Sequence, residues 1–251
     1  MINILGPAFL LSLVLLGIHS FFGLKIIQRG IIFTDLAIGQ MSALGAAVSL
    51  FLLDGRWSYI FAVGFALAAG LLITVGCGRS RHQEAFIGLL YALGLSGVFL
   101  LLSRSPHGME KFNELMAADI LFTPKSQIVR VAGWYALIGI ILAWSQKKLA
   151  GHWRELCFFG LFALTVTSSV AMAGVMVVFA ILVGPASIVI NLEVRHPLAW
   201  AWLLGTLINL AAVILSYRLD LPTGYTLVFF HAAAAITVFL LRRRGGPAKT
   251  E

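Results

Sequence analysis

Long apolar runs dominate this sequence, and each has about the length that an α-helix needs to cross a lipid bilayer. A spanning helix takes roughly 20 predominantly apolar residues. Hydrophobic residues make up 60% of the chain and charged residues only 11%, which lies far outside the range of soluble proteins. Clear runs occur near 5–24, 31–53, 57–77, 85–103, 127–146, 198–217 and 222–241.

A further apolar stretch, 156–191, is too long for one span. Gly174 lies in its middle and Gly184-Pro185 near its end, so we expect two short spans, 156–173 and 174–190. The fold class is therefore all-α: a polytopic helical membrane protein with eight or nine transmembrane helices. Because the longest polar interval is one loop, 104–125, we expect a single transmembrane domain over 1–251.

The basic residues indicate an orientation. Of the 18 Lys and Arg residues, an N-out, C-in arrangement with nine spans places 12 inside and 6 outside. The net charge of +8 is explained by this asymmetry and by contact with membrane lipid, so we expect no nucleic-acid partner. The N-terminal run lacks a basic region and continues into a second span, which favours a first transmembrane helix over a cleaved signal peptide.

Other features are weakly informative. Cys77 and Cys157 fall near cytoplasmic span ends, where thiols stay reduced, so we expect no disulfide and no metal cluster. The outer segment 109–120 could form a short surface helix whose polar side carries Glu110, Glu114 and Asp119. With His107, these acids could attract cations or form a solvated docking surface. Nucleotide-hydrolysing and proteolytic motifs are absent from the sequence, so we expect the chain to carry no such enzymatic machinery of its own.

Energy for transport must then come from an ion gradient or a separate subunit. Two short inner segments, 78–88 and 184–198, are candidates for contact with such a subunit. Pro185 cannot continue the preceding hydrogen bonding, so it can begin a new short helix on the cytoplasmic surface. An ordinary loop with a proline turn remains the alternative.

Several segments in order resemble the membrane subunits of bacterial ABC importers for zinc, manganese or iron. "GLKIIQRGIIFTDLAIGQMSALGAAV" is similar to the family's second-span entry, and "EAFIGLLYALGLSGVFLL" to its fourth span. "AGVMVVFAILVGPASIVINL" resembles the Gly-to-Pro segment that leads to the ATPase contact, and "LDLPTGYTLVFFHAAAA" the last-span entry. The likeness covers nearly the whole chain.

This resemblance implies a homodimeric permease in the bacterial inner membrane, moving a divalent metal ion as substrate without a permanently bound cofactor. A cytoplasmic ATP-binding subunit would hydrolyse ATP, and an external metal-binding protein would deliver the ion. The expected coupling residues are Pro185, Ser187, Asn191 and Arg195.

The chain departs from the family pattern in the second span. The commoner motif has an aspartate followed four residues later by a histidine, whereas Asp35 is followed at that spacing by Gly39 and one residue later by Gln40. At 100° per residue, Gln40 lies ~140° from Asp35, while Gly39 and Ser42 share its face. Ligation by an Asp-His pair therefore does not transfer, and glutamine is a poor zinc ligand.

Four polar residues within spans have two interpretations each. Asp35 either caps the second span or serves a metal pathway or gate. Gln40 either bridges helices or lines the pathway. His19 and His231 are helix contacts or supply the imidazole missing from position 39.

Other functional classes of membrane protein remain as alternatives. An ABC permease for a metal chelate or another small solute would share every feature above. A secondary transporter would usually show charged pairs or broken helices in two related halves, and no internal repeat is evident. An intramembrane enzyme would need convergent catalytic groups, and a passive scaffold would not need spans rich in Gly and Ala.

Overall fold

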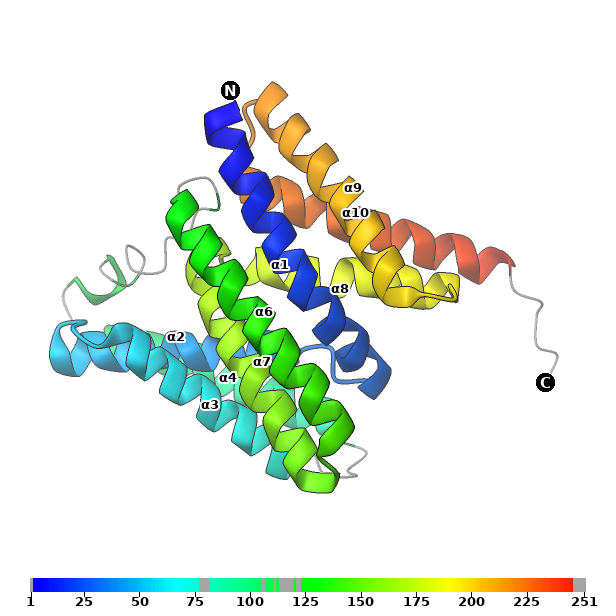
Figure 1. Cartoon of the computed structure of the whole chain (residues 1–251). Helices are drawn as coiled ribbons and strands as arrows, with labels where there is room; N and C mark the ends of the chain where they lie inside the picture. Colours follow the sequence, from blue (N-terminus) through cyan, green and yellow to red (C-terminus); the bar gives the residue numbers. More distant parts are fainter. Residues whose placement is uncertain are drawn as a thin grey trace. The chain divides into compact units, whose positions relative to one another are not determined.

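The computed structural model describes residues 2–76, 82–104, 107–110, 112, 120 and 123–245, and within these the side chains of 2–5 and 243–245 are left out. The described part contains nine long helices and no strand (Figure 1). They are α1 (Ile2–Arg29), α2 (Thr34–Leu53), α3 (Ser58–Gly76), α4 (Gln83–Leu102), α6 (Lys125–Lys148), α7 (Gly151–Ala173), α8 (Val175–Leu192), α9 (Pro197–Arg218) and α10 (Thr223–Gly245).

All nine helices are long and apolar enough to cross a membrane, which confirms the polytopic helical class and the higher of the two expected span counts within the described residues. The long stretch 156–191 divides at Gly174, as predicted. Gly174 has φ 80° and ψ 157°, a conformation that few residues other than glycine adopt, and it ends α7 through an N–H bond to the Val170 carbonyl. Helix α8 begins at the next residue.

The prediction that Pro185 begins a separate surface helix is wrong. Helix α8 runs without a break from Val175 to Leu192 and contains Pro185 in its interior. Prolines are tolerated within membrane helices where neighbouring helices compensate for the missing hydrogen bond. Here Pro185 is buried, and its ring lies against Gly205 of α9, where a Cβ would be only 3.1 Å from Pro185 Cγ. Pro185 is thus accommodated within α8 by close packing against α9.

Some expectations lie outside the described residues: Cys77, Glu114, Asp119 and most of the surface helix proposed for 109–120. Cys157 is a half-buried free cysteine in α7. The orientation of the chain in the membrane and its single-domain character remain predictions.

The chain divides into two compact units, which are described separately. Unit 1 comprises Met1–Arg29, Ile120–Ile128 and Met176–Glu251, and so contains α1, α9, α10 and nearly all of α8. Its helices approach closely at glycines. A Cβ at Gly23 of α1 would collide with the Leu182 carbonyl oxygen of α8, so these two backbones are in direct contact. Next to this contact, Leu24, Ala186, Val189 and Ala201 form an apolar cluster.

Unit 2 comprises Gly30–Asp119 and Val129–Val175, and so contains α2, α3, α4, α7 and most of α6. Helix α2 packs against α3, α4 and α7. A Cβ at Gly45 would collide with the Phe61 carbonyl oxygen of α3, and one at Gly94 of α4 would lie 2.9 Å from the Gln40 carbonyl carbon. Small residues at these crossings allow the close backbone contact typical of membrane helices.

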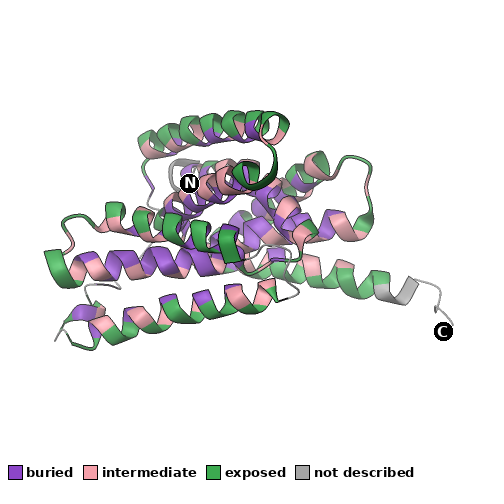
Figure 2. Cartoon of the chain, turned by 90° about the horizontal axis from the view of Figure 1, so that it is seen from below, coloured by how far each residue is buried: buried purple, intermediate pink, exposed green. Residues whose placement is uncertain are grey.

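Each helix has an exposed side (Figure 2), and many of the exposed positions carry large hydrophobic side chains. In α4, for example, Leu89 and Leu100 are each 71% exposed. Lipid tails are as apolar as these side chains, so such faces fit a membrane environment. Most buried positions in α2 are instead small or polar, including Asp35, Gly39, Ser42 and Ser49.

Candidate functional site

Asp35 lies in the first turn of α2 and is only 2% exposed. The N-cap position is Phe33, which makes no side-chain cap bond, so Asp35 is the second residue of the helix and not its cap. Its carboxylate interacts with the backbone N–H groups of Asp35 and Leu36, where the helix dipole favours a negative charge. The other carboxylate oxygen, Oδ1, is buried and has no hydrogen-bond partner in the described part of the chain.

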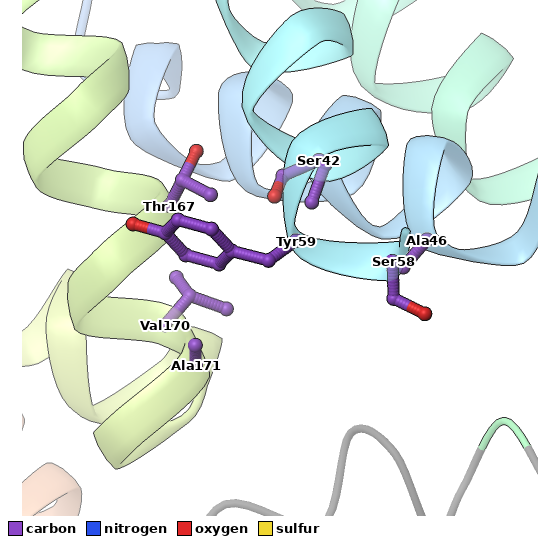
Figure 3. Close-up of a pocket in the computed structure, with 8 residues that line it drawn as sticks. Ser42, Ala46, Ser58, Tyr59, Thr167, Val170 and Ala171 are labelled. Carbon is purple, nitrogen blue, oxygen red and sulfur yellow. The ribbon is translucent and has the colours of Figure 1, made fainter. Parts of the chain in front are cut away.

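The face of α2 that carries Asp35 points towards α7 and α3. A Cβ at Gly39 would lie 3.9 Å from Val170 of α7 and 3.8 Å from Val175, the first residue of α8. Ser42 lines a pocket with residues of α3 and α7 (Figure 3). Gln40 lies on another side, where its backbone and Cβ pack on Gly94 of α4. Asp35 and Gln40 therefore face different neighbours, as the helical spacing predicts.

Glu84 of α4 fixes the loop that precedes α2. Its Oε1 accepts a hydrogen bond from the Ile32 N–H at 2.5 Å, while Oε2 is buried without a partner among the described residues. This contact holds the start of α2, and with it Asp35, against α4. No sequence pattern singles out Glu84, because its importance depends on which loop its helix contacts.

A buried hydrogen-bonded relay joins three helices of unit 1. His231 of α10 contacts Asn209 of α9 through a 2.8 Å bond between Nε2 and Oδ1. The Asn209 amide nitrogen in turn donates to the Ser12 carbonyl of α1 at 3.3 Å. Asn209, Ser12 and His231 are each fully buried. We name this set, Ser12, Asn209 and His231, the relay.

The relay determines which imidazole nitrogen carries the proton. The Ser12 carbonyl only accepts, so the Asn209 nitrogen must face it and the Asn209 oxygen must face His231. His231 Nε2 is consequently the donor. In the neutral ring Nδ1 is then a bare acceptor, buried without a partner among the described residues and close to Gly184 of α8.

His19 is also fully buried, and its Nδ1 bonds the Leu15 carbonyl of its own helix at 2.8 Å. Both histidines belong to unit 1, whereas Asp35 and Gln40 belong to unit 2. The described residues contain no group of three or more His, Cys, Asp or Glu side chains that could hold a metal ion.

The expected coupling residues lie at the end of α8 and in the loop that follows. Pro185 is buried, and Ser187 and Asn191 are half-buried, with the Asn191 amide donating to the Ser187 carbonyl at 2.9 Å. Arg195 is exposed. The exposed part is thus the turn 192–196, in which Glu193 has a positive φ of 52° and pairs with Arg242 of α10 at 2.6 Å.

Asn209 is the residue that sequence reasoning missed in unit 1. It is a lone amide in the apolar span "LLGTLINLAAVIL", and a survey of every polar residue at membrane depth would have found it. Its partners could not be identified in that way, because they come from helices distant in the sequence.

Comparisons with known proteins support the resemblance. The sequence model of the family described as "ABC 3 transport family" matches residues 152–242. The chain is 22% identical over 224 residues to a "Probable iron transport system membrane protein" of Haemophilus influenzae, covering 79% of this chain and 82% of that protein. It is 26% identical over 212 residues to "Manganese transport system membrane protein MntB" of Synechocystis, covering 74% of this chain and 66% of that protein.

Among solved structures, PsaBC from Streptococcus pneumoniae in complex with Fab has a TM-score of 0.68 at 18% identity. The match covers 93% of this chain and 90% of that one, so the two share a fold. Together with nine membrane-length helices in the described residues, these matches confirm the family resemblance. The chain is a multi-pass protein of the bacterial inner membrane, and over residues 152–242 it is similar to the ABC 3 transport family.

Proposed function

We propose that this chain is the transmembrane subunit of an ABC importer that moves a divalent transition-metal ion (zinc, manganese or iron) across the inner membrane. The names of its relatives, which refer to iron and manganese transport, support a metal substrate. The observation that carries the proposal is Asp35, a carboxylate 2% exposed in a membrane span with one oxygen free of protein partners in the described chain.

Asp35 would serve as an oxygen ligand or gate for the passing ion. An ionisable side chain at membrane depth is costly and usually marks a pathway for an ion or substrate. The helix N-terminus lowers that cost, since the dipole favours the carboxylate and backbone N–H groups donate hydrogen bonds to it. One oxygen is occupied in this way, while Oδ1 is available to a cation.

The partners follow from the family. The permease would act as a homodimer with a separate ATP-hydrolysing subunit on the cytoplasmic side and an external metal-binding protein. The exposed turn 192–196 after α8, including Arg195, is the best-placed surface for the ATPase in the predicted orientation. Asn191 and Ser187 would support this turn from the last turns of α8.

Metal accumulation in cells tests the role of Asp35. Asp35→Asn keeps the size and removes the charge, so loss of a charged ligand worth roughly 1.5–3 kcal/mol should lower uptake by about tenfold or more at equal expression. Asp54→Asn is the matched control, because Asp54 is exposed just after α2 and asparagine also adopts its left-handed conformation.

If Asp35 served only the helix terminus, Asp35→Asn would transport as wild type with zinc, manganese and iron alike. That result would remove the observation on which the proposal depends. Asp35→Ala should in addition lose roughly 0.3–1 kcal/mol of stability through the missing first-turn charge.

Co-purification tests the coupling surface. Charged, bulky replacements at Ser187 and Asn191, or Arg195→Glu, should release the ATPase subunit while the permease still inserts in the membrane. Unchanged co-purification would place the ATPase contact elsewhere.

A further inference from the structure

A basic surface surrounds the turn between α6 and α7 in unit 2. The two helices lie side by side (Figure 1), and Tyr135 of α6 shares a 2.7 Å hydrogen bond with Ser169 of α7. Six exposed side chains near the turn are basic or aromatic, and we name them the basic turn: Trp144, Lys147, Lys148, His152, Trp153 and Arg154. We propose that the basic turn binds the headgroup of an anionic phospholipid in the cytoplasmic leaflet.

The connection between the two helices is short and keeps these side chains together. Only Leu149 and Ala150 lie between the end of α6 and the start of α7. The Leu149 N–H donates to the Ser145 carbonyl at 2.9 Å, so the backbone follows the helix for one residue more. Gly151 has a φ of 55°, in the left-handed region that favours glycine, and so turns the chain into α7. The end of α6 and the first turn of α7 therefore lie at the same end of the helix pair.

The lysines and the arginine have no partner of opposite charge among the described residues. Lys147, Lys148 and Arg154 are in neither of the ion pairs found there. Glu155, the next residue in the chain, is half-buried and has another interaction within the protein. The lysines suit the negative end of α6, but Arg154 follows the positive end of α7, where a cation is unfavourable. Helix stability therefore does not account for the arginine, and its charge suits an external anion.

The position of the turn relative to the membrane favours a lipid headgroup as that anion. The lysines directly follow the apolar span of α6, and in the predicted orientation they lie on the cytoplasmic side. Trp144 and Trp153 are 57% and 69% exposed. Tryptophan is enriched at the level of the headgroups, because its ring is apolar and its N–H is polar. Lysine and arginine stems cover apolar surface while their charged ends reach the phosphate.

Charge complementarity selects the class of lipid. Clusters of Lys and Arg directly next to a span are attracted to the anionic lipids of the cytoplasmic leaflet. From Trp144 to Arg154 the sequence has three formal positive charges and no carboxylate, so a zwitterionic headgroup would leave them without compensation. An acidic protein partner would match the charges but would give no reason for two exposed indoles at headgroup depth. This inference does not depend on which ion is transported.

A local reporter tests the site in the purified full-length protein, held in micelles of an uncharged detergent. Ala143→Cys, labelled with a bimane fluorophore, is an exposed position one turn before Lys147 and keeps all six side chains of the basic turn. The chain also carries Cys77→Ser and Cys157→Ser. Phosphatidylglycerol with a nitroxide near its ester groups should quench the fluorophore at about tenfold lower concentration than the matching phosphatidylcholine, because each basic residue near an anionic surface contributes about a factor of five.

Lys148→Gln combined with Arg154→Gln removes one charge from each helix. It should raise the half-quenching concentration of phosphatidylglycerol about tenfold and leave that of phosphatidylcholine unchanged. The matched control is Arg104→Gln combined with Lys125→Gln, which removes two exposed charges without a tryptophan within four residues in the sequence. It should bind phosphatidylglycerol as wild type does. Size-exclusion chromatography checks folding, and Lys147→Gln with Arg154→Gln replaces the first variant if that one fails to fold.

Equal quenching by the two lipids in the wild-type chain would overturn the lipid site, and so would wild-type binding by the Lys148→Gln, Arg154→Gln variant. The same loss in the control would show attraction to total charge and would also overturn it. Glycerol phosphate at matched concentration should not displace the lipid, and displacement would identify a soluble phosphate as the ligand. Absence of lipid preference, together with loss of the ATPase subunit from the charge variant on co-purification, would make the basic turn a protein contact.

Discussion

The relay of unit 1 and the Asp35 face of α2 in unit 2 are both polar and both buried, but their polar groups have different partners. In the relay, Asn209 uses its amide to connect α9 with α1 and α10. On the α2 face, Asp35 Oδ1 has no partner among the described residues. Polar groups that satisfy one another hold helices together, whereas groups without protein partners suit a passing ligand.

The largest loss of stability should come from a substitution at a helix crossing in unit 2 that has no space for a side chain. Gly45→Ala would place a Cβ against the Phe61 carbonyl oxygen, and backbone cannot move aside easily. Overpacking of this kind costs about 1–3 kcal/mol or more. We expect much less folded protein, measured by size-exclusion chromatography in detergent and by thermal unfolding.

Gly39→Ala on the same helix is the matched control. Its Cβ would meet only Val170 and Val175 at ordinary contact distance, and alanine is better than glycine in a helix by about 1 kcal/mol. This variant should be as stable as wild type or slightly more stable. Equal stability of the two alanine variants would contradict the close α2–α3 contact.

The relay should show an energetic coupling between Asn209 and His231. Asn209→Leu leaves the His231 Nε2–H unpaired in the core, at a cost of roughly 1–3 kcal/mol. In a double-mutant cycle with His231→Phe, the coupling should be about 0.6–1.7 kcal/mol, the range found for hydrogen bonds between membrane helices. Unfolding in mixed detergent micelles measures both values.

A zero coupling energy would mean that the relay is not what joins α9 and α10. A structural role also predicts near-normal uptake per folded molecule in these variants. Loss of metal uptake with unchanged stability would instead indicate that His231 belongs to the transport pathway. The relay would then differ less from the Asp35 face of α2.

A smaller effect is expected from the ion pair between Arg242 and Glu193. Both side chains are largely exposed, at 43% and 77%, so the pair should contribute only about 0.2–1 kcal/mol and less at high salt. Arg242→Ala and Glu193→Ala, compared in thermal unfolding at low and high salt, check this. A large salt-independent loss would show that the turn after α8 depends on the pair.

The smallest effect, measured as metal uptake, should come from the substitution Gln40→Ala. Its contact with Gly94 is made by backbone and Cβ atoms, which alanine keeps. Gln40→Ala should therefore take up metal at a rate close to wild type, in contrast to Asp35→Asn in the same assay. A strong loss of uptake would extend the pathway to the α4 side of α2.

Hydropathy and helical geometry were sufficient to predict much of this architecture. Apolar runs located the nine described spans, Gly174 divided the longest run, and the five-residue spacing separated Gln40 from Asp35. Local rules failed at Pro185, because burial against Gly205 decided whether the helix continued. Asn209 and Glu84 could not be assigned partners, since their bonds span 22, 197 and 52 residues of sequence.

Gly39 has an implication for protein engineering. It is the position one turn from Asp35 at which the commoner family motif carries an imidazole, and a Cβ there meets only valine methyl groups at van der Waals distance. Gly39→His would therefore test metal preference by adding a nitrogen donor to this face of α2, at a position where the added Cβ makes only ordinary contacts. At Gly45 the same experiment would begin by separating two helices, so position 39 is where specificity can be redesigned while the scaffold is kept.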